Sequence, residues 1–257
     1  MSISVRHLSA RLGRKTILHD VAFTAEAGEV TAIVGPNGSG KTTALRCLSG
    51  DLAYDGAITI NGRDPRSYQP WELAAIRAVL PQASALAFPF TVLEVVRLGL
   101  VAGAVGDRAG LAARALDRVG LAGFEGRFYQ ELSGGEQARA QLARVLAQVW
   151  APLPDGAPRW LLLDEPVAAL DIAHQRVVMG LARDFVRDGG GVIAVMHDLN
   201  LTAGFAHRMV LFSEGTVLAT GRPADVMTDA TLSRAYGCPV RVGVTPPAPF
   251  LLPMPLS

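Results

Sequence analysis

The sequence has no long apolar run, few cysteines and no excess of charge of one sign. Its longest stretches without Asp, Glu, Lys or Arg are 16 residues, at 78–93 and 242–257, and both contain proline. A membrane-spanning helix needs about 20 apolar residues. The two cysteines, Cys47 and Cys238, cannot build a disulfide framework. Because 24 Lys and Arg nearly balance 23 Asp and Glu, we expect no nucleic-acid partner. The first residues lack the charged-then-apolar pattern of a signal peptide, so we expect a cytosolic chain, or one docked on a membrane without crossing it.

A strand, a glycine-rich loop and a helix follow one another early in the chain. Residues 30–34 are apolar and rich in β-branched side chains, and residues 41–48 have the composition and apolar spacing of a helix. Similar apolar runs end at Asp164 and at His197. Near-continuous apolar runs are typical of strands that are buried on both faces of a parallel sheet. They predict a parallel core that contains at least one βα unit.

The N-terminal part has a different pattern. Its apolar segments, 3–12, 21–25 and 57–60, are short or alternate with polar residues, and a turn signal, Asn61-Gly62, follows the third. They predict an antiparallel layer beside the parallel core. The expected fold class is therefore α/β, a mostly parallel sheet flanked by helices with an N-terminal antiparallel β layer.

The middle of the chain has no strong strand signal and predicts a helical subdomain at about residues 86–150. The last twelve residues, 246–257, hold five prolines and predict an extended tail. We expect the remaining residues, 1–245, to form one domain that carries the helical subdomain as an insert. The helices predicted within that subdomain cover residues 91–100, 108–119 and 133–150.

The glycine-rich loop matches the pattern G-x-x-x-x-G-K-[ST] in a strand–loop–helix context. Its glycines let the backbone curl so that successive N–H groups point at a phosphate, and the helix that follows adds the positive end of its dipole. Lys41 supplies a charge to the β- and γ-phosphates, and the Thr42 hydroxyl can ligate Mg²⁺. The loop predicts a site for a nucleoside triphosphate. The residues expected to bind it are Gly35, Pro36, Asn37, Gly38, Ser39, Gly40, Lys41, Thr42 and Thr43.

An acidic pair, Asp164 and Glu165, follows the apolar run at 160–163. The carboxyl ends of parallel strands are where open α/β sheets bind their ligands. Asp164 is expected to hold Mg²⁺ through water, and Glu165 is expected to act as the general base on the attacking water.

A third motif, LSGGEQ, occupies residues 132–137. Ser133 and Glu136 have the spacing of a capping box, in which both residues satisfy backbone donors at a helix start. A cap alone does not require Gly134 and Gly135, which lower helix propensity and leave N–H groups open to a ligand. With these three motifs in this order, the whole chain resembles the ATP-binding-cassette (ABC) ATPases, which have a P-loop NTPase core, and LSGGEQ resembles their signature motif.

The resemblance implies a site completed by two copies of the chain. In that family two subunits face head to tail, and the signature of one contacts the γ-phosphate held by the other. Gln82 matches the glutamine loop, which senses the γ-phosphate and magnesium, and His197 matches the switch histidine. The site residues that the resemblance implies are Glu165, His197 and Gln82 for catalysis, Ser133, Gly134, Gly135 and Glu136 for the partner's ATP, and Thr42, Gln82 and Asp164 for Mg²⁺.

Two positions depart from the family pattern. The loop Ala169-Leu170-Asp171 fits the segment that couples the two sites, but Ala168 stands where a serine is usual, so one interface hydroxyl is missing. An aromatic residue commonly stacks on adenine near the second strand, whereas this sequence has RLGR at residues 11–14. Either Leu12 or an arginine side chain is expected to cover the base.

The chain further resembles the importer ATPases for iron–siderophore, cobalamin and haem uptake, and its proline-containing insert at 148–159 looks most like that of the haem importers. The resemblance implies two transmembrane permease subunits, a periplasmic substrate-binding protein as an indirect partner, and a peripheral place on the cytoplasmic face of the inner membrane. An apolar cluster, Leu86, Phe88 and Phe90, is expected either to lie in the core or to receive a helix of the permease.

Other functions remain open at this level. A soluble ABC ATPase that scaffolds iron–sulfur cluster assembly has similar length and motifs, and another transported substrate is compatible with the same chain. A DNA-repair cassette needs a long coiled-coil insert between Lys41 and Ser133, which this sequence has no room for. A nucleotide kinase would share the phosphate loop but has no use for the signature.

Overall fold

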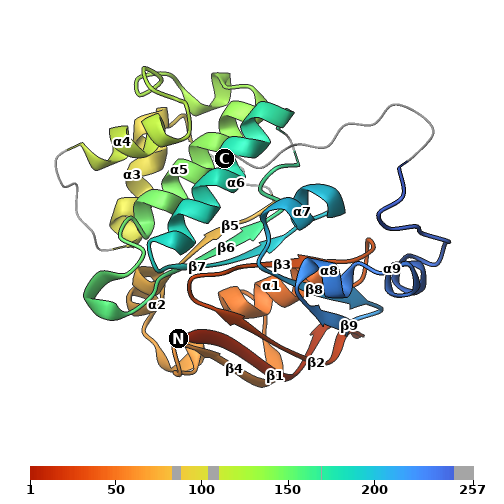
Figure 1. Cartoon of the computed structure of the whole chain (residues 1–257). Helices are drawn as coiled ribbons and strands as arrows, with labels where there is room; N and C mark the ends of the chain where they lie inside the picture. The colour runs from red at the N-terminus through yellow and green to blue at the C-terminus, as the bar shows by residue number, and fades with distance from the viewer. Residues whose placement is uncertain (83–87, 104–109, 169, 246–257) are drawn as a thin grey trace.

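A computed structural model describes residues 1–82, 88–103, 110–168 and 170–245. A six-stranded sheet forms its centre, in the order β5-β6-β7-β3-β8-β9 (Figure 1). Neighbouring strands pair in parallel except β8 with β9, which pair antiparallel. The strands in that order are Arg77–Leu80, Trp160–Asp164, Gly191–Val195, Val30–Val34, Arg208–Ser213 and Thr216–Gly221. The predicted mostly parallel sheet is confirmed.

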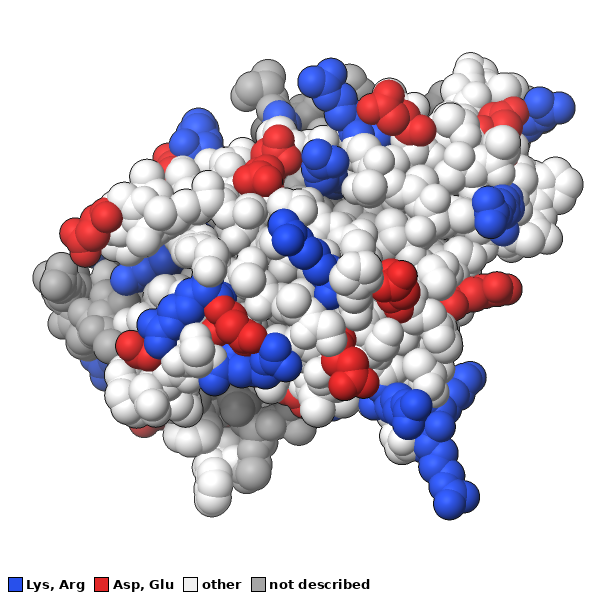
Figure 2. All heavy atoms as spheres, turned by 90° about the horizontal axis from the view of Figure 1, so that it is seen from below, with Lys and Arg blue, Asp and Glu red and all other residues white. Residues whose placement is uncertain are grey.

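The antiparallel layer is a separate sheet of three strands. Its order is β2-β1-β4, with β1 at Ser2–Leu12, β2 at Lys15–Glu26 and β4 at Tyr54–Ile60. On the face that Figure 2 shows from below, basic and acidic side chains are interspersed. The predicted N-terminal antiparallel layer is confirmed.

Two apolar cores flank the parallel sheet because its strands are buried on both faces. Ile33, Leu162 and Ile193 pack with helix α1 (Lys41–Ser49) and the antiparallel sheet, whereas the alternate residues Ala32 and Leu161 pack with helices on the other face. Alternation of side chains along each strand produces this division. Helix α1 therefore lies between the two sheets, and the loop that precedes α1 is held from both sides.

The helical subdomain covers the face of the parallel sheet away from the antiparallel layer (Figure 1). Its helices are α3 (Val92–Ala102), α4 (Leu111–Arg118) and α5 (Gly134–Gln148). Each overlaps one predicted helix, and α3 begins at a capping box of Thr91 and Glu94. The exact domain limits stay a prediction, and the tail at 246–257, with part of the segment that precedes α3, lies outside the described residues.

The remaining helices are short except α6. None of the described helices is both long enough and apolar enough to cross a membrane. These remaining helices are α2 (Pro70–Ile76), α6 (Ile172–Arg187), α7 (Leu199–Phe205), α8 (Pro223–Val226) and α9 (Asp229–Tyr236). Short 3₁₀ turns lie at Pro65–Ser67, Tyr129–Glu131 and Pro154–Gly156.

Candidate nucleotide site

The phosphate loop leaves the end of β3 and enters α1 through glycines that no other residue could replace without strain. Gly35, Gly38 and Gly40 have φ values of 143°, 78° and 102°, in a region that side chains disfavour. A Cβ at Gly35 would overlap the carbonyl oxygen of Phe212 in β8. The sharp turn therefore follows from both the torsions and the packing of the neighbouring strand.

Lys41 is folded back onto its own loop. Its Nζ donates hydrogen bonds to the carbonyl oxygens of Gly35, at 2.8 Å, and of Pro36, at 2.9 Å, and the residue is 5% exposed. Burial lowers the pKa of this ammonium, and the nearby Glu165 and Asp164 oppose that shift. A phosphate that enters the loop can therefore replace two neutral acceptors with charged oxygens, which form stronger hydrogen bonds.

Asp164 ends β6 directly behind the loop. The Thr42 hydroxyl donates to Asp164 Oδ1 at 3.3 Å, and the aspartate is 5% exposed. Burial, and secondarily the charge of Glu165, raises the pKa of the Asp164 carboxyl, while Thr42, His197 and Lys41 lower it. A buried carboxylate held at a raised pKa is favourably placed to receive a cation, because the cation would offset the cost of its charge.

The donor set fits Mg²⁺. Thr42 and Asp164 offer a hydroxyl and a carboxylate, and both line a small pocket together with Gln82. Hard oxygen ligands of this kind suit Mg²⁺, which binds through one or two carboxylates together with substrate phosphates. Among the described residues no cluster of three His, Cys, Asp or Glu could hold a metal alone. The protein groups would thus supply only part of the coordination, and the nucleotide the rest.

Glu165 and His197 meet because β6 and β7 are neighbours in the sheet. His197 Nε2 lies 2.5 Å from Glu165 Oε1, so the imidazole and the carboxylate are in direct contact. Glu165 has a φ of 51°, and its backbone N–H donates to the Val195 carbonyl at 3.1 Å. The unusual torsion turns the side chain toward the phosphate loop instead of continuing the strand.

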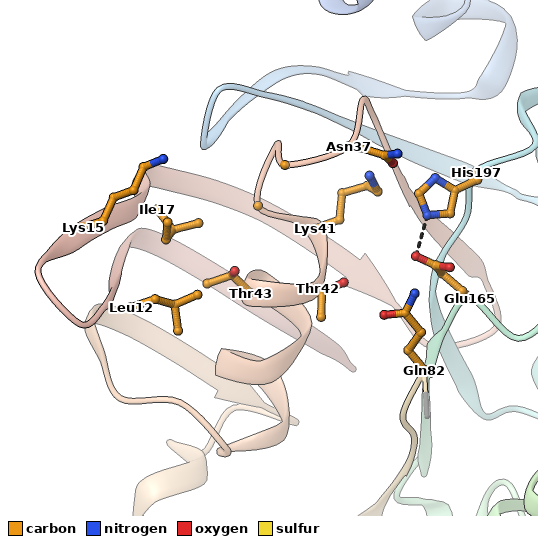
Figure 3. A pocket seen from close by; sticks show the side chains of 12 residues that line it. Leu12, Lys15, Ile17, Asn37, Lys41, Thr42, Thr43, Gln82, Glu165 and His197 are labelled. Carbon is orange, nitrogen blue, oxygen red and sulfur yellow. Dashed lines mark hydrogen bonds and ion pairs between the residues drawn. The ribbon is translucent and has the colours of Figure 1, made fainter. Parts of the chain in front are cut away.

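These groups line one pocket of about 670 Å³ (Figure 3). Gln82, Glu165 and His197 lie at one end of it, and Lys41 and Thr42 lie in the middle. The predicted site residues that the structure brings together here are Asn37, Gly38, Gly40, Lys41, Thr42, Thr43, Gln82, Glu165 and His197.

The other end of the pocket was only partly foreseen. Leu12, Lys15 and Ile17, from β1 and β2, line it. Leu12 is the residue anticipated as a cover for the base, whereas Lys15 and Ile17 were missed, and neither Arg11 nor Arg14 is among the lining residues. The alternation of polar and apolar residues along β2 does not indicate that Lys15 and Ile17 line a pocket. These residues reach the phosphate loop only because the two sheets pack together.

The signature residues do not reach this pocket. The Ser133 hydroxyl accepts a hydrogen bond from the Glu136 N–H at 3.3 Å, and Glu136 Oε2 accepts one from the Ser133 N–H at 2.7 Å. The predicted capping box is therefore confirmed, and the Ser133 N–H and hydroxyl, which both donate to the Glu136 carboxylate, lower its pKa. Ser133 and Gly134 are exposed. A Cβ at Gly134 would meet no atom within 4 Å, so the chain's own packing does not require glycine there.

The coupling loop is described only in part. Leu170 is buried, and Asp171 caps α6 through a hydrogen bond that Oδ1 accepts from the His174 N–H at 2.9 Å. Ala168 is exposed, and Ala169 lies outside the described residues.

A phosphate loop after β3, an acidic pair after β6 and a histidine after β7 define a P-loop nucleotide hydrolase. A sequence model of the family described as "ABC transporter" matches residues 18–168. The chain therefore belongs to the ABC transporter family, as an ATP-hydrolysing subunit.

Relatives of known name resemble almost the whole chain. The "Hemin import ATP-binding protein HmuV" of Jannaschia sp. (strain CCS1) is 62% identical over 253 residues, which cover 98% of this chain and 94% of that protein. The protein of the same name from Roseobacter denitrificans is 59% identical over 255 residues, 98% of both chains. The dimeric structure of a bacterial ABC transporter cassette is similar with a TM-score of 0.74 and 27% identity, over 86% of this chain and 98% of that one.

Proposed function

We propose that the chain hydrolyses ATP to energise the import of haem, or of a related iron or cobalt chelate, across an inner membrane. One observation carries the ATPase part: a single pocket is lined by Lys41, Thr42, Gln82, Glu165 and His197, while the signature lies outside it. The identity of 62% with a hemin import ATP-binding protein supports the cargo.

In this proposal the residues of the pocket act in sequence. Lys41 leaves the Gly35 and Pro36 carbonyls and pairs with the β- and γ-phosphates. Glu165 accepts a proton from the water that attacks the γ-phosphate, and His197, hydrogen-bonded to Oε1, holds the carboxylate in place. When bound, Mg²⁺ supplies charge neutralisation at the phosphates, and Thr42, Asp164 and Gln82 are the residues that would hold it.

The exposed signature motif supports a head-to-tail homodimer. Ser133, Gly134 and Gly135 would contact the γ-phosphate bound by a second copy, with Glu136 fixing the serine through the capping box. Phosphate charge would then be paired from two sides, so ATP binds the closed pair more tightly than the open one. Loss of the γ-phosphate removes that preference and lets the pair reopen.

The surface at Phe88, six residues after Gln82 in the sequence, is the proposed contact with the membrane subunits. Phe88 is 67% exposed and stacks edge-on against Phe90, which packs on the core of the helical subdomain. The cluster is thus divided: Phe90 lies against the core and Phe88 is open to a partner, while Leu86 lies outside the described residues. In each copy of the chain, a helix of one permease subunit would cover Phe88. This contact would hold the chain on the cytoplasmic face of the membrane, and a periplasmic binding protein would deliver the cargo.

Reconstitution with the permease tests the proposal. The tagged chain should co-purify from membranes with a polytopic protein, and the complex in proteoliposomes should show ATP hydrolysis stimulated by haem-loaded binding protein. Stimulation by cobalamin or a ferric siderophore instead would correct the cargo. Co-purification with iron–sulfur assembly proteins and no membrane protein would favour the scaffold function.

A substitution at Phe88 checks the proposed contact with the permease. Phe88→Asp should lower recovery of the complex. Trp71→Asp is the matched control, because Trp71 is 64% exposed.

A further inference from the structure

Helix α5 carries a row of buried and half-buried polar side chains that have no role in the proposed hydrolysis. Gln137, Gln141, Arg144 and Gln148 recur every three or four residues, so they share one face of the helix. Gln141 and Gln148 are 5% and 6% exposed. Buried polar groups are costly unless they are hydrogen-bonded, so the partners of this row, named here the α5 polar row, show what it holds together.

At one end the α5 polar row holds the edge of the parallel sheet. Within the described part of the chain, strand β5 pairs only with β6, and no strand there partners the carbonyls of its other side. Gln148 Nε2 donates to the Arg77 carbonyl at 3.0 Å and to the Ala74 carbonyl at 2.8 Å. Arg144 Nη2 donates to the Val79 carbonyl at 3.4 Å. The helix therefore takes the place of a missing strand along β5, whose chain runs directly into Gln82.

At the other end the α5 polar row reaches the residue before the signature serine. Arg144 Nε donates to Gln141 Oε1 at 2.7 Å, and Gln141 Nε2 donates to the Tyr129 hydroxyl at 3.2 Å. Gln137 Nε2 donates to the carbonyls of Tyr129, at 3.2 Å, and Leu132, at 3.1 Å. Hydrogen-bonded side chains thus run without interruption from Val79 to Leu132.

Helix α3 presses on the same two turns of α5 from the other side. A Cβ at Gly99 would overlap the Arg144 carbonyl oxygen, and a Cβ at Gly103 would overlap the Gln148 carbonyl oxygen. The backbones approach this closely only because both positions are glycine. Arg144 and Gln148 are therefore held by β5 through their side chains and by α3 through their backbone.

We propose that Gln141, Arg144 and Gln148 are positioning residues that lock the signature helix to the glutamine-loop strand, so that Ser133 and Gln82 move together when nucleotide binds. The proposal rests on the proposed function, in which Gln82 meets one nucleotide and Ser133 the other. A network with two tightly packed ends transmits a shift at β5 to the start of α5, because packed elements change position as units.

Gln141→Met tests the link at its centre, because methionine keeps the volume and flexibility of glutamine and removes both hydrogen bonds. We expect turnover at saturating ATP to fall about fivefold or more. ATP affinity of the single chain should stay within about twofold, since no loop residue is touched. Arg139→Met is the matched control: Arg139 is a buried cation on the same helix, but its guanidinium donates to the Val119 and Gly120 carbonyls, which lie outside β5. It should keep turnover near that of the unmodified chain.

Tyr129→Phe is the second variant, which removes one hydroxyl and keeps the ring, so it remains informative if Gln141→Met does not fold. In a serial link, breaking a second contact adds little. The double variant Tyr129→Phe/Arg144→Met should therefore be no slower than its slower single variant, within about twofold. Multiplying effects would instead mean independent packing roles and would overturn the proposal.

Hydrogen exchange of the nucleotide-free chain separates this proposal from the proposed function. In Gln141→Met the amides of β5 and of the first turn of α5 should exchange about fivefold faster or more, and in Arg139→Met those of β5 should not. If the unmodified chain hydrolyses no ATP, the proposed function fails while exchange still decides on the link. Normal β5 exchange, or turnover within twofold of the unmodified chain in folded Gln141→Met, would overturn the link.

Discussion

The two glycine-rich segments of this protein are held in different ways. In the phosphate loop, Gly35 needs a positive φ and has no room for a Cβ beside Phe212. In the signature, Gly134 lies in the first turn of α5 with open space around it. The fold of one chain explains the first glycine and leaves the second without a structural reason.

The two segments thus belong to half-sites of different kinds. The phosphate-loop side is the completed half, because its groups come together within one chain, and the signature is the presented half, because it is exposed and lies outside that pocket. The phosphate loop, Glu165 and His197 are positioned by β3, β6 and β7 and meet within one pocket, and Asp164 lies behind the loop in contact with Thr42. The signature is held by a capping box and lies outside that pocket. A capped helix start with bare N–H groups is suited to an anion from outside the chain.

Glu165→Gln should have the largest effect on the completed half. Turnover is expected to fall about 10²–10⁴-fold, because a general base contributes that much, while ATP affinity is retained. Phosphate release and calorimetry measure the two quantities. The variant should also accumulate as an ATP-dependent dimer in light scattering; a monomer at saturating ATP would refute the contribution of a second copy.

Ser133→Arg attacks the presented half. Turnover should fall about 10²-fold or more because a bulky cation replaces a donor to the transferred phosphate, with ATP binding to the single chain unchanged. The variant also loses a helix cap, so Thr91→Arg, which removes the equivalent capping box from α3, is the control and should retain turnover. Near-normal hydrolysis by Ser133→Arg would exclude the signature from the mechanism.

Lys41→Ala should weaken ATP binding about 10–100-fold, the worth of hydrogen bonds to a charged group. The loss is net of the two carbonyl contacts that Lys41 makes without nucleotide. Titration calorimetry with ATP checks it, and Lys15→Ala, at the opposite end of the pocket, gives the comparison. An unchanged affinity would contradict the placement of the phosphates.

Two glycine substitutions test the comparison by stability alone. Gly35→Ala should lower the free energy of unfolding by about 1–3 kcal/mol, from backbone strain. Gly134→Ala should leave it unchanged or raise it by as much as about 1 kcal/mol, because alanine favours a helix. Urea unfolding of both variants without nucleotide measures the contrast. Equal losses would show that Gly134 is also required by the fold.

Local signals explain which features could be predicted from the sequence. The phosphate loop and the capping box of Ser133 and Glu136 depend on residues within a few positions of each other, and both formed as expected. His197 could be named only through the family resemblance, and its contact with Glu165 was not predicted, since their distance depends on β6 and β7 being neighbours.

Strand β5 had no usable signal of its own. It is four residues long, and its outer carbonyls are satisfied by Arg144 and Gln148, far along the chain. Lys15 and Ile17 were missed for the same reason, because the packing of one sheet on another carries them to the pocket. Long-range pairing, unlike a turn or a cap, leaves no short pattern to read.

The positions of Lys15 and Lys41 have a practical consequence. They are the only two lysines in the sequence, and both line the nucleotide pocket. Amine-reactive chemistry therefore has two side-chain targets in this sequence, the exposed Lys15 and the buried Lys41. An acylating probe can thus footprint the pocket directly, with the order of labelling set by accessibility and with bound nucleotide as the protecting agent.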